Sequence, residues 1–222
     1  MCKCTPHVRT PFCGRPGCEW PPPIPPTYSK HEPNYVMQAH LVRAILEQWQ
    51  AYSWTVQGFG MVRTKLADVG RIHIWDSRLA VPLVSTIHEH PWPLSSLVIS
   101  GELLNQRFGH AGDYGLPYKR SRIATGEGGG LIGEPEDICI LPSVHEAFGP
   151  GASYSQAPEE LHRSIPQDGT VTLLSRPMGE PLQETWVYWP RGDEWVSAEP
   201  RPAKEFEVSR AVMLALNRWN GA

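Results

Sequence analysis

The strongest constraint on the fold of this chain is a series of short β-type segments separated by glycine and proline. From residue 54 onward, runs of β-branched and aromatic residues alternate with turn residues, and the 222-residue chain contains 23 prolines and 20 glycines. This composition favours many turns over long helices. We therefore predict a mainly β fold, a double-sheet jelly roll or a barrel. The expected strands are 54–62, 71–76, 81–87, 94–99, 103–108, 138–141, 170–175 and 185–189.

Two helices are expected outside this β region. Apolar residues recur at helical spacing between about residues 33 and 53, and a second broadly helical pattern near the C-terminus ends at an Asn-Gly pair. A chain of this length can bury one good core. We therefore expect a central β domain with its preceding helix over 27–200, an N-terminal arm over 1–26, and a C-terminal helix over 201–222. That last helix should pack on the barrel or on a partner subunit.

Residues 102–150 carry a glycine-rich sequence, TGEGGGLIGEPED, that superficially resembles a phosphate-binding loop. It lacks the following G-K-[ST] and a following helix pattern, so nucleotide binding is not predicted. We expect this stretch to form a flexible connection or flap.

The sequence His88-Glu89-His90 is the main indication of a functional site. Side chains alternate between the two faces of a strand, so an H-x-H places both imidazoles on one face, where they can bind a single cation. On a helix the same residues would lie about 200° apart. The β-branched residues of 81–87 and the run 94–100 predict that both histidines lie on strands near a turn.

A third histidine, His162, precedes another strand-like run. Together these residues resemble the cupin superfamily, which has two histidine-containing motifs. His88, His90 and Gly101 match the spacing of the first motif, and Gly151 and His162 match the second. The resemblance implies a cupin-type double-stranded β-helix that holds a metal. The glutamate ligand of the family is replaced here by leucine or serine, which leaves three histidine ligands.

Two narrower resemblances bear on function. The phrase HEHPWPLSSLVISGE with the later Leu161-His162-Arg163 is similar to a group of uncharacterised cupin-like proteins encoded by bacteriophages. The three histidines also resemble those of the thiol dioxygenases. Leu174 and Arg176 stand where that family has a histidine and a tyrosine that assist its chemistry. The resemblance therefore implies oxygen activation at a non-haem iron in a broader sense than cysteine oxidation.

Three neutral imidazoles bind divalent metals and leave coordination positions open for water, oxygen or substrate. We favour Fe(II), with Zn(II), Mn(II), Ni(II) and Cu(II) as alternatives. Tyr154, Gln156 and Glu160 share the parity of His162, so in an extended chain they face the same side. The candidate catalytic residues are Glu160, as a fourth ligand or general base, Tyr154 and Arg176. The candidate substrate-binding residues are Trp92, Arg107 and Gln156, and His73 is expected in the core or supporting a ligand.

Four cysteines, Cys2, Cys4, Cys13 and Cys18, crowd into the first eighteen residues of the chain. Thiolates paired by short loops suit tetrahedral zinc, and the segment is too short and polar to build a core without a staple. Two disulfides or a disordered reduced tail are the alternatives. The fifth cysteine, Cys139, is expected to be a buried strand residue.

Charge and hydropathy limit the partners of the chain. A net charge of −3 with mixed signs gives no basic field, so nucleic acid is not expected as a partner. No apolar run approaches the ~20 residues of a membrane span and no signal peptide is evident, which predicts a soluble cytoplasmic protein, in the host cytoplasm if it is phage-encoded. The cupin resemblance implies a possible homodimer through barrel edges.

Three functions remain open at this level. The first is a metal-dependent oxidoreductase, dioxygenase-like, that acts on a small molecule. The second is a metal-dependent sugar or nucleotide-sugar isomerase or epimerase. The third is a non-catalytic phage accessory protein that binds a ligand. Fold resemblance alone does not name a reaction.

Overall fold

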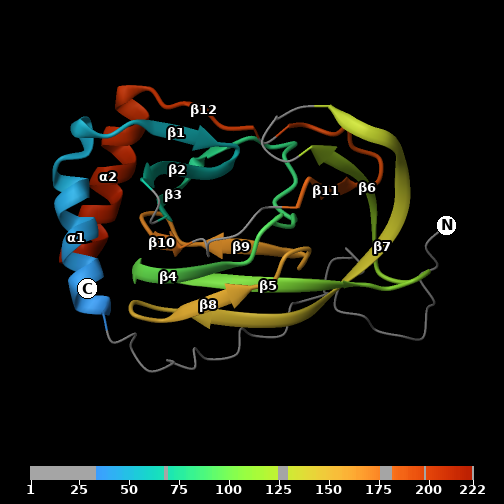
Figure 1. Ribbon diagram of the computed structural model, residues 1–222, viewed down its shortest axis with the longest axis horizontal. Coiled ribbons are helices and arrows are strands. Elements are labelled where there is room, and N and C mark those ends of the chain that lie inside the picture. The colour runs from blue at the N-terminus through green and yellow to red at the C-terminus, as the bar shows by residue number, and fades with distance from the viewer. Residues whose placement is uncertain (1–33, 68–69, 125–129, 176–181, 198, 222) are drawn as a thin grey trace.

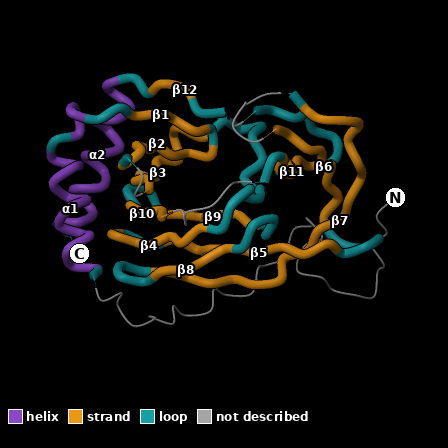
Figure 2. Tube along the Cα trace, viewed as in Figure 1, coloured by secondary structure: helices purple, strands orange, loops and turns teal. Residues whose placement is uncertain are grey.

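The computed structural model describes residues 34–67, 70–124, 130–175, 182–197 and 199–221. Strands dominate this part of the chain, and two helices lie together at one end of the molecule (Figures 1 and 2). The fold is mainly β with flanking helices and is compatible with the predicted jelly roll. The N-terminal arm with its four cysteines lies outside the described residues.

The helices and strands are ordered along the chain so that one helix precedes the strands and a second helix follows them. They are α1 (Tyr35–Glu47), the 3-10 turn η1 (Trp49–Ala51), β1 (Trp54–Gln57), β2 (Phe59–Leu66), β3 (Gly70–Ala80), β4 (Leu94–Ser100), β5 (Leu103–His110), β6 (Leu116–Ala124), β7 (Leu131–Phe148), β8 (Ser153–Gln156), β9 (His162–Pro166), β10 (Val171–Ser175), β11 (Glu184–Pro190), β12 (Arg201–Pro202) and α2 (Glu205–Asn220).

The strands form two antiparallel sheets. The larger has the order β12-β1-β2-β3-β10-β4-β8, and the smaller has the order β11-β6-β7-β5-β9. The chain passes from one sheet to the other between β4 and β5 at Gly101, whose φ is +79°. A Cβ there would lie 2.5 Å from Thr170 Oγ1, so glycine is required at this crossing.

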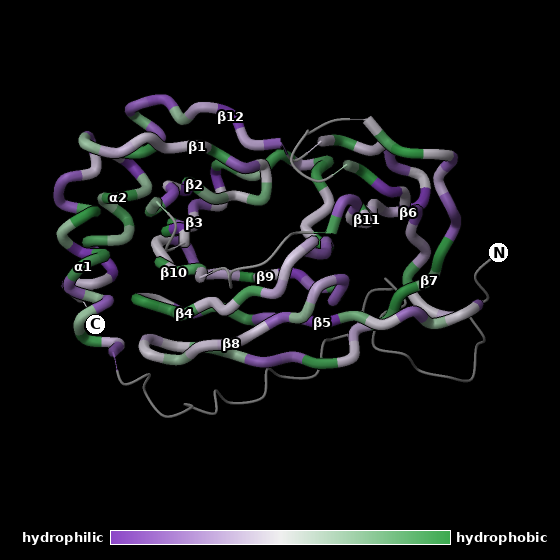
Figure 3. Tube along the Cα trace, viewed as in Figure 1, coloured by the Kyte–Doolittle hydropathy of each residue, from purple (hydrophilic) through white to green (hydrophobic). Residues whose placement is uncertain are grey.

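Both helices pack on the outer face of the larger sheet. Buried residues at helical spacing, such as Val42 and Leu46 on α1 and Ala211 and Ala215 on α2, meet the outward residues of the strands in the largest apolar cluster. Figure 3 shows the mixed hydrophobic and hydrophilic residues expected of amphipathic helices. Within the described residues, neither helix is long and apolar enough to cross a membrane. The C-terminal helix α2 thus contacts the larger sheet, chiefly β3.

A second apolar cluster fills the space between the two sheets. Its buried members are Met61, Trp75, Val98, Leu103 and Tyr154, which come from five different strands of both sheets. Because side chains alternate along a strand, the residues two positions away from these members face the same interior. This interior is where the three histidines gather.

Residues 81–87 do not form the predicted strand. They make a turn, with the Val84 amide 3.0 Å from the Val81 carbonyl, and the chain stays irregular until β4 begins. The prediction that His88 and His90 lie on strands is therefore wrong, except that His88 forms isolated bridges. Prolines at positions 82, 91 and 93 explain the difference, since proline cannot donate to a strand ladder.

The strands predicted at 103–108 and 138–141 are present, but the flexible connection or flap predicted for the rest of 102–150 is wrong where the structure describes it. This stretch contains β5, β6 and the long β7, which pair with one another across most of the smaller sheet. Pro135 has no backbone N–H, yet it does not end β7. The β6–β7 register shifts between Arg120 and Arg122, opposite Pro135, so no ladder hydrogen bond from residue 135 is needed there. The predicted strand 54–62 is in fact two strands, β1 and the start of β2, separated at residue 58.

Candidate functional site

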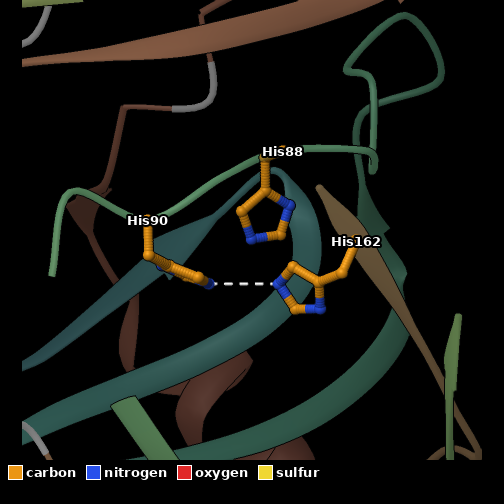
Figure 4. Close-up of side chains that lie close together, drawn as sticks. All are labelled: His88, His90 and His162. Atoms are coloured by element: carbon orange, nitrogen blue, oxygen red, sulfur yellow. Dashed lines mark hydrogen bonds between the residues drawn. The ribbon is translucent and has the colours of Figure 1, made fainter. Parts of the chain in front are cut away.

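The three predicted histidines come from two segments of the fold, His88 and His90 from one and His162 from the other, and their rings lie close together (Figure 4). His162 is the first residue of β9. His88 lies on the irregular connection before β4 and forms antiparallel bridges with His162 and with Val187 of β11. Two backbone hydrogen bonds between His88 and His162, of 2.9 and 3.0 Å, hold the H-x-H segment against β9. His90 follows two residues later.

The rings of these three residues, which we call the three-histidine site, are close enough to share one ion. One ring nitrogen from each lies within 4.8 Å of the others. The ring centroids are 4.7 to 5.2 Å apart in the three pairs. His90 Nε2 lies 3.1 Å from His162 Nε2, as the dashed line in Figure 4 marks. The site could hold a metal ion.

The geometry of the closest pair fits metal ligation. Two nitrogen ligands about 2.0–2.1 Å from one metal, at tetrahedral or octahedral angles, are roughly 2.9–3.4 Å apart. The observed 3.1 Å falls within that range. Without an ion, this contact requires one Nε2 to carry a proton and the other to accept it. With an ion, both nitrogens become ligands and the contact needs no proton.

Acceptors on the far sides of two rings set their orientation. His162 Nδ1 lies 2.9 Å from Asn105 Oδ1, and His88 Nδ1 lies 2.9 Å from the Thr86 carbonyl oxygen. A carbonyl oxygen only accepts, so Nδ1 carries the proton in each ring and Nε2 keeps its lone pair. The His88 ring also stacks on Phe59, with centroids 4.7 Å apart and planes 14° apart.

The surroundings keep all three imidazoles neutral. Burial lowers the pKa of His88, against the opposing effect of its hydrogen bond to Thr86. Burial, then the neighbouring His88, lowers the pKa of His90 and of His162 well below the usual range. Neutral imidazole is the form that binds metal. Taken as whole residues, His88 and His90 are half-buried and His162 is buried.

Glu160 and Arg107 pair with each other close to the site. Arg107 Nη1 lies 2.6 Å from Glu160 Oε1, and Arg107 faces His162 in the β5–β9 register. The second carboxylate oxygen of Glu160 accepts a hydrogen bond of 3.2 Å from the Ala157 amide. This carboxylate therefore closes the short connection between β8 and β9. Its role as a ligand or base, and that of Arg107 in substrate binding, stay predictions.

The other candidates lie at different depths. Trp92 lies beside His90, with ring centroids 6.3 Å apart, and Arg71 lies over the Trp92 ring at 5.5 Å. Tyr154 is buried in the interior apolar cluster against Phe148. Gln156 is only 3% exposed. Arg176 and the four N-terminal cysteines lie outside the described residues.

Sequence reasoning missed the residues that orient the histidines. Asn105, Phe59 and Thr86 lie outside the two motifs, and only the parity of Asn105 with Arg107 on β5 could have indicated it. Two other expectations hold. His73 is buried on β3 and Cys139 is buried on β7.

A separate hollow of about 320 Å³ adjoins Glu89, the residue between the two histidines. Tyr188 donates a hydrogen bond of 2.6 Å to Glu89 Oε1, and Arg120 and Trp186 line the same hollow. Burial raises the pKa of Glu89 to about 7, although its hydrogen bond from Tyr188 opposes the shift. Glu89 thus contacts a different environment from its two neighbours, as alternation along an extended segment predicts.

No protein-family model matches this chain, and a comparison with curated proteins found no match. The fold and the three-histidine site are compatible with a cupin-like protein.

Proposed function

We propose that this chain is a metal-dependent enzyme, a dioxygenase-like oxidoreductase that acts on a small molecule at the three-histidine site. The observation that supports this proposal most is the joint geometry of the three rings: one nitrogen of each lies within 4.8 Å of the others. A metal at such a site acts as a Lewis acid or a redox centre.

Different residues of the chain would bind the metal and line the opening of the site. His88, His90 and His162 would hold Fe(II), or alternatively Zn(II), Mn(II) or Ni(II), through Nε2. Three protein ligands leave coordination positions open, and the partial exposure of His88 and His90 would let a small molecule reach them. Trp92, beside His90, would shield that opening from water.

The first test is the metal content of the full chain purified without a histidine tag. We expect the wild type to retain metal, and His90→Ala to lose the equivalent bound at the three-histidine site. His40→Ala is the matched control, because His40 is an exposed histidine on α1. Cys13→Ser tests the predicted N-terminal zinc site separately. Equal metal content in wild type and His90→Ala would exclude a metal at the three-histidine site.

The second test addresses the reaction. Fe(II)-loaded protein exposed to nitric oxide should give the spin-3/2 electron paramagnetic resonance signal of an open iron site, and His90→Ala should not. Oxygen uptake is then measured with panels of small acids, thiols and phenols. Metal binding with no oxygen uptake on any panel would contradict the oxidoreductase and leave the isomerase or the ligand-binding protein.

A further inference from the structure

The H-x-H segment separates two different environments inside the fold. His88 forms bridges with both β9 and β11, which are the two edge strands of the smaller sheet. This sheet therefore curls until the H-x-H segment joins its two edges. The rings of His88 and His90 lie with His162 in the three-histidine site (Figure 4). Ile87 and Glu89 have the opposite parity, so they face the inside of the curl.

A third apolar cluster fills part of this curl. Its buried members come from β5, β7 and β11 and from the connections before β4 and β9; they are Ile87, Phe108, Ile140, Leu161 and Tyr188. Glu89 lies against this cluster, because Tyr188 donates a hydrogen bond of 2.6 Å to its Oε1. The hollow of about 320 Å³ described above is lined by Glu89, Phe108, Leu161 and Tyr188, among others. We call it the Glu89 hollow.

One carboxylate oxygen in the Glu89 hollow lacks a hydrogen-bond partner. Glu89 is 7% exposed, and its Oε2 is buried without a hydrogen bond from any described residue. Burial raises the pKa of this carboxyl; Tyr188 and the nearby Trp186 amide oppose the shift without supplying a hydrogen bond to Oε2. An ionised carboxylate only accepts hydrogen bonds, and a buried acceptor without a donor is unfavourable. A ligand in the hollow could supply that donor.

The basic groups in and around the hollow are already matched or uncharged. Arg120, which lines the hollow, donates to Glu136 Oε2 at 3.0 and 2.8 Å. Glu160, which also lines it, is paired with Arg107 at 2.6 Å. Burial and then Arg120 lower the pKa of His110, so this ring is neutral at pH 8. None of these groups leaves a positive charge over.

Two carboxylates of the hollow are left without a positive partner. Neither Glu89 nor Glu159 forms an ion pair with a basic residue in the described part of the chain. The Glu159 amide donates a hydrogen bond of 3.1 Å to the His90 carbonyl oxygen, which holds this exposed residue at the rim of the hollow. The two carboxylates are close enough for their charges to interact. A cation in the hollow would be attracted to both, and an anion would be repelled.

We propose that the Glu89 hollow is a second ligand site, separate from the three-histidine site, and that it binds a small organic ammonium ion. The ammonium group donates to Glu89 Oε2, which lacks a donor, and Glu159 adds a second negative charge at the rim. The hydrocarbon part of the ligand packs against the rings of Phe108 and Trp186. The volume of the hollow is at the lower end of the ~300–1,000 Å³ of small-molecule pockets. The inference goes beyond the proposed function and does not rest on it.

The experiment is titration calorimetry of the full chain with benzylamine, which is a cation at pH 8. The protein is first stripped of metal with a chelator, because a free amine can itself ligate a metal. Benzyl alcohol has a similar shape without the charge, and benzoate has the opposite charge. We expect benzylammonium to bind at least about tenfold more tightly than either comparison ligand, since a charge-assisted hydrogen bond is stronger than a neutral one.

Three variants locate the ligand. Glu89→Gln keeps the shape of the side chain but removes its charge, and should weaken benzylammonium by about tenfold. Glu159→Gln should weaken it by about two- to fivefold, because an exposed carboxylate contributes less. Glu205→Gln is the matched control, since Glu205 is exposed in the first turn of α2, on the outer face of the larger sheet. It should bind benzylammonium like the wild type.

Thermal unfolding gives a second readout and checks that each variant folds. Saturating benzylammonium should raise the Tm of the metal-free wild type and leave that of Glu89→Gln unchanged. Equal affinity or an equal rise in Tm for these two proteins would overturn the site. So would the absence of benzylammonium binding to the wild type, or benzyl alcohol or benzoate binding as tightly as benzylammonium. Wild-type affinity in Glu159→Gln would remove the rim carboxylate from the site, even if Glu89→Gln did not fold.

Discussion

The hydrogen bond between Asn105 and His162 should set the metal affinity of the three-histidine site. Asn105 is fully buried and its Oδ1 lies 2.9 Å from His162 Nδ1. Asn105→Leu keeps a side chain of similar size but removes the acceptor that holds the proton on Nδ1. The His162 ring would then be free to change tautomer or to rotate, and its Nε2 would be a weaker ligand.

The size of the effect follows from two separate costs. Loss of a group that orients a metal-ligating histidine lowers metal affinity by about 10–100-fold, which is about 1.4–2.7 kcal/mol of binding free energy. Leaving the buried His162 N–H unpaired costs about 1–3 kcal/mol of folding stability. The substitution also removes the unpaired Nδ2 of Asn105, which offsets part of that loss. We therefore expect a large change in metal affinity with a smaller change in stability.

The assay is competition for Zn(II) or Co(II) between the protein and a chelator of known affinity, with thermal unfolding of the metal-free protein alongside. Asn217→Leu is the control, because Asn217 is an exposed asparagine on α2. It should match the wild type in both measurements. A metal affinity of Asn105→Leu within twofold of the wild type would refute the reasoning that this hydrogen bond prepares the ligand.

Three further predictions concern stability. In the folded chain the pKa of His73 is lowered to about 3, so the neutral, buried form of this ring stabilises the fold fully above pH 6.5 and progressively less as the pH falls toward 3. The metal-free wild type should therefore lose stability between pH 7 and pH 5. His73→Leu should make that loss smaller by about 2 kcal/mol. Parallel pH profiles would contradict this. The pKa of Glu89 is raised to about 7, so ionisation of this buried carboxyl lowers the free energy of unfolding above that pH. Glu89→Gln should therefore raise the free energy of unfolding by about 1–3 kcal/mol at pH 8, with no gain at pH 4.5. A gain of equal size at both pH values would show that ionisation is not the cause. Ile72 is fully buried beneath the helices, so Ile72→Ala should cost about 2–5 kcal/mol in denaturant unfolding while metal binding persists. A cost under about 1 kcal/mol would contradict the packing described for that cluster.

Much of the fold could be predicted because its signals are local. The helical spacing before β1 and at the C-terminus indicated α1 and α2, and β-branched runs indicated most of the strands. Strands β6 and the first part of β7, within 102–150, were not predicted for the same reason. Residues 132–137 of β7 are exposed on both faces, so they show no alternation of buried and exposed residues, and their pairing with β6 makes them a strand.

The sequence by itself determined the class of fold and the three imidazoles that could bind a metal, since H-x-H spacing and strand-like runs are properties of neighbouring residues. Only the tertiary structure decided that His162 meets His88 through a backbone bridge and that Asn105 orients the His162 ring. These residues come from different strands, and their proximity depends on sheet register and on where the chain crosses between sheets. No spacing along the chain encodes that arrangement, because strand pairing is a contact between distant segments.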